Sequence, residues 1–333
     1  MTFEIRVIDP ADEAELRRWW ATGHQAMAGR PYDLRDTWET TRAMMSRPHD
    51  DFQETLLAAY ADGEMVGSAQ LLLPVADNLT MSYADVTVPE QHRRRGVGSA
   101  LLADVEERAR AAERAYVLVE VLAPVGVVGP GEQFAAVRGY PIAQREAVKV
   151  LDLDDHPDWA PLARKVSERA DGYRIQTWGD LTPAEHAPAL CEALNVFISL
   201  IPRGDVAIED IAMTPERLRR NENRALELGR RRHTAAAFAP DGTLAGYSDL
   251  FVPPHVVDHA DVGITMVLPE HRGHALGLAM KLATHADLMA AEPACRLVTT
   301  NNADANAQMN AVNEQLGYRL VEQQLEVQKV ISS

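Results

Sequence analysis

The hydrophobic positions of this chain follow the same order of patterns twice. In each half a short apolar strand, over residues 83–88 or 262–268, is followed by a loop and then by apolar residues at helical spacing. A β-branched strand comes next, over 116–122 or 296–300, as expected for a buried central strand. Strand, helix and strand in this order predict a right-handed crossover in each half. The helical apolar positions are Leu101, Leu102, Val105 and Ala109 in the first half and Leu278, Leu282, Ala286 and Met289 in the second.

Three sequence anchors recur along the chain at nearly one offset. Agreement among independent anchors indicates a duplicated unit, so we interpret the chain as two tandem copies of one α/β unit. The anchors are Gly67 with Gly246 and Arg93 with Arg272, 179 positions apart in both cases, and Gly139-Tyr140 with Gly317-Tyr318, 178 positions apart.

The repeat predicts domain boundaries. We expect an N-terminal domain over 1–153, a linker over 154–172 that is partly helical, and a C-terminal domain over 173–333. An Asp-Gly pair in each copy, at 62–63 and 241–242, predicts a tight β-hairpin turn. The second copy has extra sequence within 195–222, which we expect to form a longer loop over the cleft.

Composition narrows the class of protein. A chain of 333 residues with 46% hydrophobic and 25% charged residues has room for two folded domains. Its formal charge of −16 argues against a general nucleic-acid binder. Cys191 and Cys295 imply no disulfide framework and are expected to be buried. The chain shows neither a signal peptide nor an apolar run of membrane-spanning length, so we expect a cytoplasmic protein without membrane partners.

A basic glycine loop lies between the predicted strand and helix of the first copy. Its sequence is Arg93-Arg94-Arg95-Gly96-Val97-Gly98-Ser99. Backbone amides at a helix N-terminus favour an anion, glycines allow close approach, and arginines add positive charge. The loop therefore predicts a diphosphate site, the alternative being a plain tight turn.

The loop pattern resembles that of the Gcn5-related N-acetyltransferase (GNAT) superfamily. Arg93-x-x-Gly96-x-Gly98 matches the pattern fully, whereas the second copy has Ala275 at the first glycine, between Arg272 and Gly277. The resemblance implies two tandem GNAT domains, each a mixed, largely antiparallel sheet with flanking helices. Two splayed strands in such a domain would admit an acyl-CoA, for which we expect acetyl-CoA. We favour the first copy for tight binding because a Cβ at residue 275 would crowd the diphosphate. Tandem relatives in which the C-terminal domain catalyses are the counterargument.

The resemblance also implies site residues. Asp85, on the strand before the loop, matches the position of a catalytic carboxylate, and Tyr83 is a candidate proton donor. The alternative for Asp85 is an ordinary strand-end carboxylate. The tyrosine that GNAT enzymes place four residues before the terminal glycine is replaced by Ala135 and Asn313. Asn302 and Asn306 are candidates for contact with pantetheine, the alternative being a helix capped by Asn302 or Asp304 with Asn306 inside it. The predicted cofactor-binding residues are Val86, Val88, Arg93, Arg94, Arg95, Gly96, Val97, Gly98 and Ser99 in the first copy, and Val267, Arg272, Gly273, His274, Gly277, Asn302 and Asn306 in the second.

Two further clusters have competing interpretations. The aromatic residues Trp19, Trp20, Tyr32 and Trp38 would line an acceptor pocket or, more commonly, pack in the core. The histidines and aspartates of residues 255–261 suggest a metal site only superficially, so we expect a solvated loop and no metal.

These features predict an acyl-CoA-dependent N-acyltransferase, in which the primary amine of a small molecule attacks acetyl-CoA directly in a ternary complex. A mycothiol-synthase-like acetyltransferase is a narrower alternative. A non-catalytic acyl-CoA-binding or scaffolding protein is the alternative from another class, motivated by the missing tyrosines and the altered second loop. We expect a monomer or a homodimer.

Overall fold

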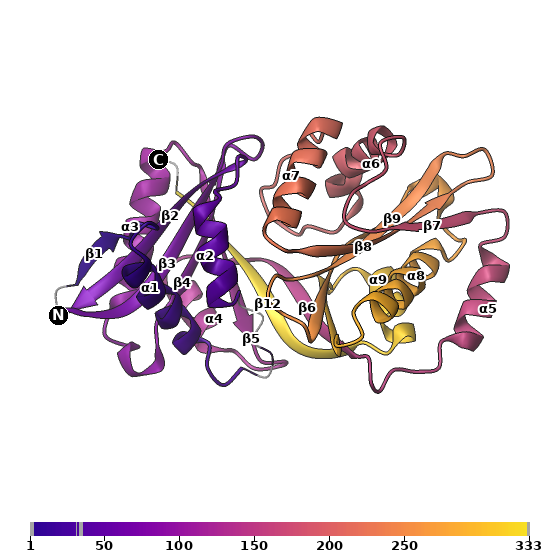
Figure 1. Ribbon diagram of the computed structural model, residues 1–333. Helices are drawn as coiled ribbons and strands as arrows, with labels where there is room; N and C mark the ends of the chain where they lie inside the picture. Colours follow the sequence, from indigo (N-terminus) through magenta and orange to yellow (C-terminus); the bar gives the residue numbers. More distant parts are fainter. Residues whose placement is uncertain (1–2, 31, 33–35, 332–333) are drawn as a thin grey trace. The chain divides into compact units, whose positions relative to one another are not determined.

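The computed structural model describes residues 3–30, 32 and 36–331. The chain forms two compact units of mixed α/β structure whose strands pair mostly antiparallel, as predicted (Figure 1). The first unit comprises Met1–Arg145, Arg203–Glu209 and Gln324–Ser333, and the second comprises Glu146–Pro202 and Asp210–Gln323. Each unit is described by itself below.

In the first unit the strands lie in the order β1, β2, β3, β4, β5 and β12. Successive residues of a strand point to opposite faces, so each face of this sheet has its own core. Leu57 and Ala59 pack beneath α3 and α4, whereas Leu56 and Ala58 pack beneath α1 and α2. The elements are β1 (Glu4–Val7), α1 (Glu13–Ala26), α2 (Trp38–Ser46), β2 (Phe52–Ala61), β3 (Glu64–Pro74), β4 (Met81–Thr87), α3 (Val97–Ala111), β5 (Tyr116–Ala123), α4 (Pro130–Val137) and β12 (Arg319–Val330).

The second unit repeats this plan with the strand order β7, β8, β9, β10, β11 and β6. Ala235 and Ala237 pack beneath α8, and Ala236 and Phe238 pack beneath α6 and α7 on the opposite face. The elements are β6 (Ile142–Asp152), α5 (Ala160–Arg169), β7 (Arg174–Trp178), α6 (Ala187–Leu200), α7 (Pro215–Glu227), β8 (Arg231–Phe238), β9 (Leu244–Val252), β10 (His259–Val267), α8 (Leu276–Ala291), β11 (Leu297–Ala303) and α9 (Ala307–Leu316). The stretch predicted as a partly helical linker contains α5.

One parallel strand pair in each unit diverges along its length. The pairing of β4 with β5 ends at Ala84 and Val119, although β4 continues to Thr87 and β5 to Ala123. The pairing of β10 with β11 ends at Asp261 and Thr299, although both strands continue. The parallel pairs match the predicted crossovers. In each unit the two central strands are therefore no longer hydrogen-bonded to each other at the end from which the glycine loop departs.

The last strand of each sequence copy contributes to the unit of the other copy. Leu325 and Val327 of β12 lie in the core of the first unit, with Ile331 just after the strand, whereas Leu151 of β6 and Leu153 lie in a core of the second. The Ile331 amide donates to the carbonyl of Ala115 over 2.8 Å. The boundaries 1–153, 154–172 and 173–333 follow the sequence repeat, and the compact units depart from them at these segments.

The buried face of α8 differs from the predicted one. Leu278 is buried as expected, but Ala286 and Met289 are exposed. The buried stripe instead includes Lys281 and His285, which have polar partners inside the unit. The expectation was wrong because a hydrophobic pattern cannot register polar side chains that are buried with partners. The matching prediction for α3 is confirmed, because Leu101, Leu102, Val105 and Ala109 are all buried.

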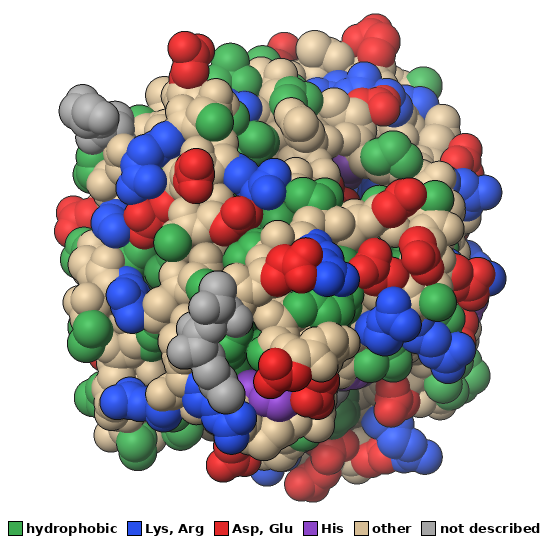
Figure 2. Space-filling view, turned by 90° about the vertical axis from the view of Figure 1, so that its left-hand side faces the viewer, with side chains coloured by type: hydrophobic (Ala, Val, Ile, Leu, Met, Phe, Trp, Pro, Cys, Tyr) green, Lys and Arg blue, Asp and Glu red, His purple; other side chains and the backbone are tan. Residues whose placement is uncertain are grey.

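No helix in the described part of the chain is long and apolar enough to cross a membrane. On the face drawn in Figure 2, acidic and basic side chains are interspersed and apolar side chains form small patches. Cys191 and Cys295 are buried free thiols, as predicted.

Candidate active site

The loop of the first unit has a backbone suited to an anion. Gly96 caps α3 in the left-handed conformation, with φ of 95°, and Arg94 also has a positive φ of 63°. The first backbone bond of the helix runs from the Ala100 amide to the Gly96 carbonyl. Within the described residues, the amides of 94–99 make no backbone hydrogen bond outside the helix. Such consecutive amides at a helix N-terminus form a concave site for negative charge.

The arginines of this loop differ in what they contact. The Nε and Nη2 atoms of Arg93 donate to the carbonyls of Val88 and Ala26, each over 2.9 Å, so this side chain ties the loop to the end of β4 and to α1. Arg94 and Arg95 are exposed. Ser99 accepts a hydrogen bond from Arg138, the C-cap of α4. Arg93 thus shapes the loop, and Arg94 and Arg95 supply its exposed charge.

The second loop has the same two left-handed backbone positions, but its glycine occupies the first of them instead of the second. Gly273 and Ala275 have φ of 90° and 55°, and they correspond to Arg94 and Gly96, 179 positions earlier. Each loop therefore has one glycine and one residue with a Cβ at its two left-handed positions. Arg272 contacts the Val267 carbonyl over 3.5 Å, at the position where Arg93 contacts that of Val88. The His274 ring lies 5.0 Å from that of Tyr173.

Apolar side chains lie beside the diverging strands of the first unit. Val86 of β4, Val88 just after β4, Val121 of β5 and Phe134 of α4 are partly buried against the core between α3 and the sheet. A Cβ on Gly98 would lie 3.5 Å from the Phe134 ring and 3.6 Å from Val88, so Gly98 leaves room beside these residues. Val97 is buried, and its side chain packs where a Cβ on Gly67 would lie.

The opposite face of the same strand carries polar groups. Asp85 stands opposite Gln70 of β3, and the Gln70 amide donates to Glu54 of β2. Tyr83 lies two residues before Asp85 and thus on the same face. Burial, reinforced by nearby carboxylates including that of Glu209, raises the pKa of Tyr83, so its hydroxyl stays protonated at neutral pH. The candidate base and the candidate donor therefore share the α1 and α2 face of β4.

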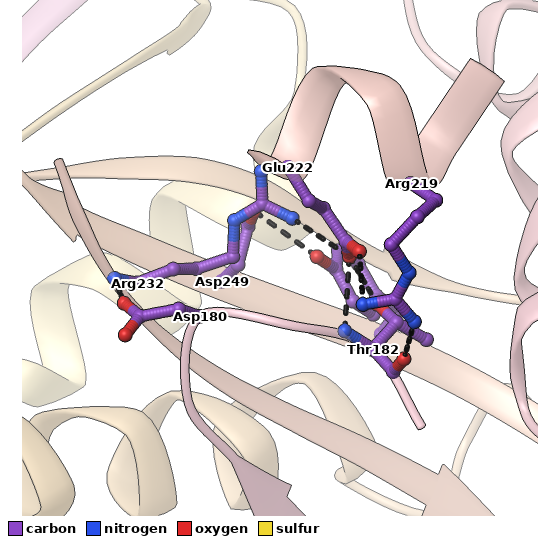
Figure 3. A network of polar contacts seen from close by, with 7 residues as sticks. Asp180, Thr182, Arg219, Glu222, Arg232 and Asp249 are labelled. Atoms are coloured by element: carbon purple, nitrogen blue, oxygen red, sulfur yellow. Dashed lines mark hydrogen bonds and ion pairs between the residues drawn. The ribbon is translucent and has the colours of Figure 1, made fainter. Parts of the chain in front are cut away.

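The corresponding face of the second unit is closed by ion pairs. Ile264 occupies the position of Asp85, 179 positions later. The neighbouring Asp249 accepts from the Ile264 amide over 2.7 Å and from the hydroxyl of Tyr247 over 3.1 Å. It also lies 3.8 Å from Arg232 (Figure 3). Its oxygens thus already have hydrogen-bonding partners in the protein.

Glu222 of α7 completes this network. Its Oε1 accepts from the Thr182 amide and hydroxyl over 3.0 and 2.6 Å and lies 3.6 Å from Arg232, while Oε2 lies 3.2 Å from Arg219 (Figure 3). The Glu222 side chain is fully buried. The network holds α7 against β8 and the segment after β7.

The asparagines predicted near pantetheine have protein partners. Asn306 is itself the N-cap of α9, with its side chain accepting from the Met309 amide over 3.1 Å, so the alternative that placed the cap at Asn302 or Asp304 and Asn306 inside the helix was wrong. Asn302 bonds to Asn310 and Asn313 over 2.7 and 3.0 Å. Sequence reasoning missed the chain of buried polar groups to which Asn302 belongs. A comparison of the two copies could have indicated this chain, because the second copy has polar residues at positions where the first copy has apolar ones.

The remaining two clusters are an aromatic group and a His/Asp group. Trp38 is buried in the core beneath α1 and α2, with Trp19 and Trp20 packed against it, and Tyr32 is half-buried. His259 lies 3.8 Å from Asp258 and 4.0 Å from Asp261. Within residues 3–30, 32 and 36–331, no group of three or more His, Cys, Asp or Glu side chains could hold a metal ion.

Comparison with known proteins agrees with this architecture. Residues 14–124 match the model of the Acetyltransferase (GNAT) family. A tandem GNAT protein from the clavulanic acid biosynthesis pathway is 26% identical, with a TM-score of 0.81 over 100% of this chain and 99% of its own. A GCN5-related N-acetyltransferase from Sphaerobacter thermophilus, 16% identical, shares the fold with a TM-score of 0.68 over 99% and 96% of the two chains. No curated protein sequence matches the chain.

The chain thus contains a GNAT acetyltransferase domain at residues 14–124 and has the tandem GNAT fold over its whole length.

Proposed function

We propose that this protein is an acyl-CoA-dependent N-acyltransferase that moves an acetyl group from acetyl-CoA to the primary amine of a small molecule, and that its first unit catalyses. One observation carries the proposal: in the first unit a single strand, β4, holds both the candidate base and the start of the loop suited to the diphosphate. The strand ends at the loop that contains Gly96, the N-cap of α3, and Asp85 stands at the point where β4 and β5 diverge. The second unit has Ala275 and Ile264 at these positions.

The loop of the first unit would hold the diphosphate of the acyl-CoA. Amides 94–99 and the exposed Arg94 and Arg95 supply the hydrogen bonds and the charge, and the apolar lining from Val86 to Phe134 suits the pantetheine arm. The two solved structures named above support this use of the fold, since both are GNAT proteins.

Asp85 would act as the base for the acceptor. It removes a proton from the acceptor ammonium, and the resulting amine attacks the thioester carbonyl, whose C–S bond then breaks. The protonated Tyr83, whose pKa is raised by burial, can donate to the departing thiolate. The carboxylates Glu54 and Asp85 on this face favour a positively charged acceptor.

Asp85→Asn tests the assignment. With acetyl-CoA and a panel of a diamine, an amino sugar and an amino acid, we expect kcat/KM to fall about 100-fold or more, the usual contribution of a general base. Acetyl-CoA affinity should stay unchanged. Asp62→Asn, at an exposed turn of the same unit, is the matched control and should keep full activity. Unchanged turnover by Asp85→Asn would remove the base assignment.

A non-catalytic acyl-CoA-binding protein is the second candidate. This candidate is favoured by Ala135 in the first copy and Asn313 in the second, since the resemblance implies a tyrosine at each of these positions. Calorimetry that shows acetyl-CoA binding, together with no turnover of any amine by the unmodified protein, would support this candidate over the enzyme. In either case Gly96→Asp should abolish most acetyl-CoA binding if the first unit is the main site, because its carboxylate would repel the diphosphate.

A further inference from the structure

A short segment of the second sequence copy, residues 203–209, belongs to the first unit. Hydrogen bonds hold it there toward both of its ends. The amide of Asp205 donates to the Ala143 carbonyl over 3.0 Å, and the amide of Glu209 donates to Oδ1 of Asn78 over 2.6 Å. The segment is therefore fixed on the first unit at two separate places.

The middle of the segment lies on the sheet face that carries the candidate base. The Gln328 side chain of β12 accepts from the Ala207 amide over 2.9 Å and donates to the Asp205 carbonyl over 3.3 Å. The preceding residue, Val327, points into the core beneath α3, so Gln328 points to the opposite face. This is the α1 and α2 face of the sheet, to which the candidate base and the candidate proton donor of β4 also point.

The carboxylate of Glu209 lies at the start of β4 on this face. Its Oε1 accepts from the hydroxyl of Thr80, one residue before the strand, over 2.7 Å. Burial is the main cause of the raised pKa of Tyr83, and the charges of Glu326 and Glu209 add to it, so both carboxylates lie near this phenol. Glu209 is itself exposed, so a ligand can reach its carboxylate.

The face between this segment and α1 is accessible to solvent. Leu118 of β5 pairs with Tyr83, so Glu120, two residues later, points to the same face. Glu120 is exposed, and Tyr83 and Asp85 are partly exposed, although all three lie on the central strands β4 and β5. By contrast, Leu56 of β2 is buried beneath α1 and α2. A ligand can therefore reach the sheet along β4 and β5.

The length of this accessible stretch limits what can contact both of its ends. Thr80, the partner of Glu209, precedes Asp85 by five residues, which is at most about 17 Å along an extended chain. Both carboxylates stand on flexible side chains that shorten the span between them. A linear amine with a charge at each end can therefore contact both carboxylates, whereas a compact amine reaches only one.

We infer that residues 203–209 form one wall of the acceptor site of the first unit, and that Glu209 selects acceptors with a second positively charged group. The inference rests on the proposed function, in which Asp85 receives the ammonium that becomes acetylated. The second ammonium pairs with Glu209 at the other end of the accessible stretch. The second sequence copy thus sets the acceptor preference of the first unit, a role that requires no catalysis by the second unit.

The test measures acceptor binding without turnover. Calorimetry on the full chain with excess coenzyme A compares 1,8-diaminooctane with 8-amino-1-octanol, which has the same length and a hydroxyl in place of the second ammonium. The diamine should bind about fivefold tighter, the effect of a favourable exposed ion pair. Glu209→Gln keeps an oxygen for Thr80 and should bind both compounds equally, with the affinity for coenzyme A unchanged.

Two further variants separate the position of Glu209 from its charge. Glu107→Gln, at an exposed position of α3 in the same unit, is the matched control and should keep the preference for the diamine. Asn78→Gly removes the acceptor of the Glu209 amide and tolerates the φ of 53° at this residue. It should reduce the preference although the Glu209 carboxylate is still present.

Four outcomes would overturn the inference. They are equal affinity for the two compounds in the unmodified chain, a preference that persists in Glu209→Gln, an undiminished preference in Asn78→Gly, and no binding of either compound. Failure of the proposed function is measured separately, as the absence of acetyl transfer from acetyl-CoA to any amine of the panel. It would leave the difference in binding between diamine and amino alcohol as a measurable property of the first unit.

Discussion

Replacing Glu222 by alanine should destabilise the second unit by about 3–5 kcal/mol, the usual effect of removing one member of a buried ion pair. Its carboxylate is fully buried and holds the Thr182 amide and hydroxyl at 3.0 and 2.6 Å. Alanine would leave these two donors without an acceptor and Arg232 with the more distant Asp249 as its carboxylate partner. Glu222→Gln keeps an oxygen for Thr182 and loses only the charge, so it should cost less than alanine.

The effect is large enough to measure by calorimetry. For a unit of this size each kcal/mol lowers the midpoint of thermal unfolding by roughly 2–4 °C, so Glu222→Ala should lower it by roughly 10 °C. Glu227→Gln, at an exposed position of the same helix, should change it by roughly 1 °C or less. A Glu222→Ala protein as stable as the unmodified one would refute the reasoning that this carboxylate holds α7 on the sheet.

Three further changes test other parts of the structure. The pKa of Lys281 is about 7 in the folded chain and ordinarily 10.5, so between these pH values the unfolded chain binds one proton more than the folded chain. The free energy of unfolding of the second unit should therefore rise by a few kcal/mol between pH 7 and pH 10, as measured by urea unfolding. Lys281→Leu should abolish this rise. Gly204→Val should destabilise the first unit by about 2 kcal/mol or more, because its Cβ would lie 2.1 Å from the Ala143 carbonyl at a φ of 54°. Gly242→Ala, at a φ of 89° and with open space around the Cβ, should cost about 1 kcal/mol in the same assay. Ala275→Gly should stabilise the second unit by about 1 kcal/mol by relieving its left-handed backbone, and an unchanged or lower midpoint would contradict this.

The sequence predicted the repeated elements because they follow local rules. The Asp62-Gly63 turn has positive φ at both residues, as a tight hairpin requires, and the apolar face of α3 is buried where the helical spacing placed it. Both parallel crossovers were also predicted. These features depend on residues that lie close together in the sequence, so the sequence of this chain alone was enough to predict them.

Long-range features were missed for a matching reason. The hydrogen bonds from Asp205 to Ala143 and from Glu209 to Asn78 place a segment of the second copy in the first unit, and no local pattern marks them. A longer loop over the cleft was predicted in this region, whereas residues 203–209 belong to the first unit. Similarly, the polar stripe of α8 is compatible with burial only because Asn313, more than 30 residues away, accepts from Lys281. Single-sequence patterns contain neither kind of partner.

The two copies share one frame but differ in the chemistry of equivalent positions. The frame of each unit is the same: one parallel pair diverges and a left-handed residue caps the following helix. Around that frame the first copy has Asp85 and Leu102 where the second has Ile264 and Lys281. Drift in a merely structural copy would replace core residues by other apolar ones, since volume and hydrophobicity are what folding requires. A buried lysine with an amide chain is the opposite change. Folding alone therefore does not account for the lysine at position 281, and the pH dependence of unfolding in Lys281→Leu measures what its burial costs the second unit.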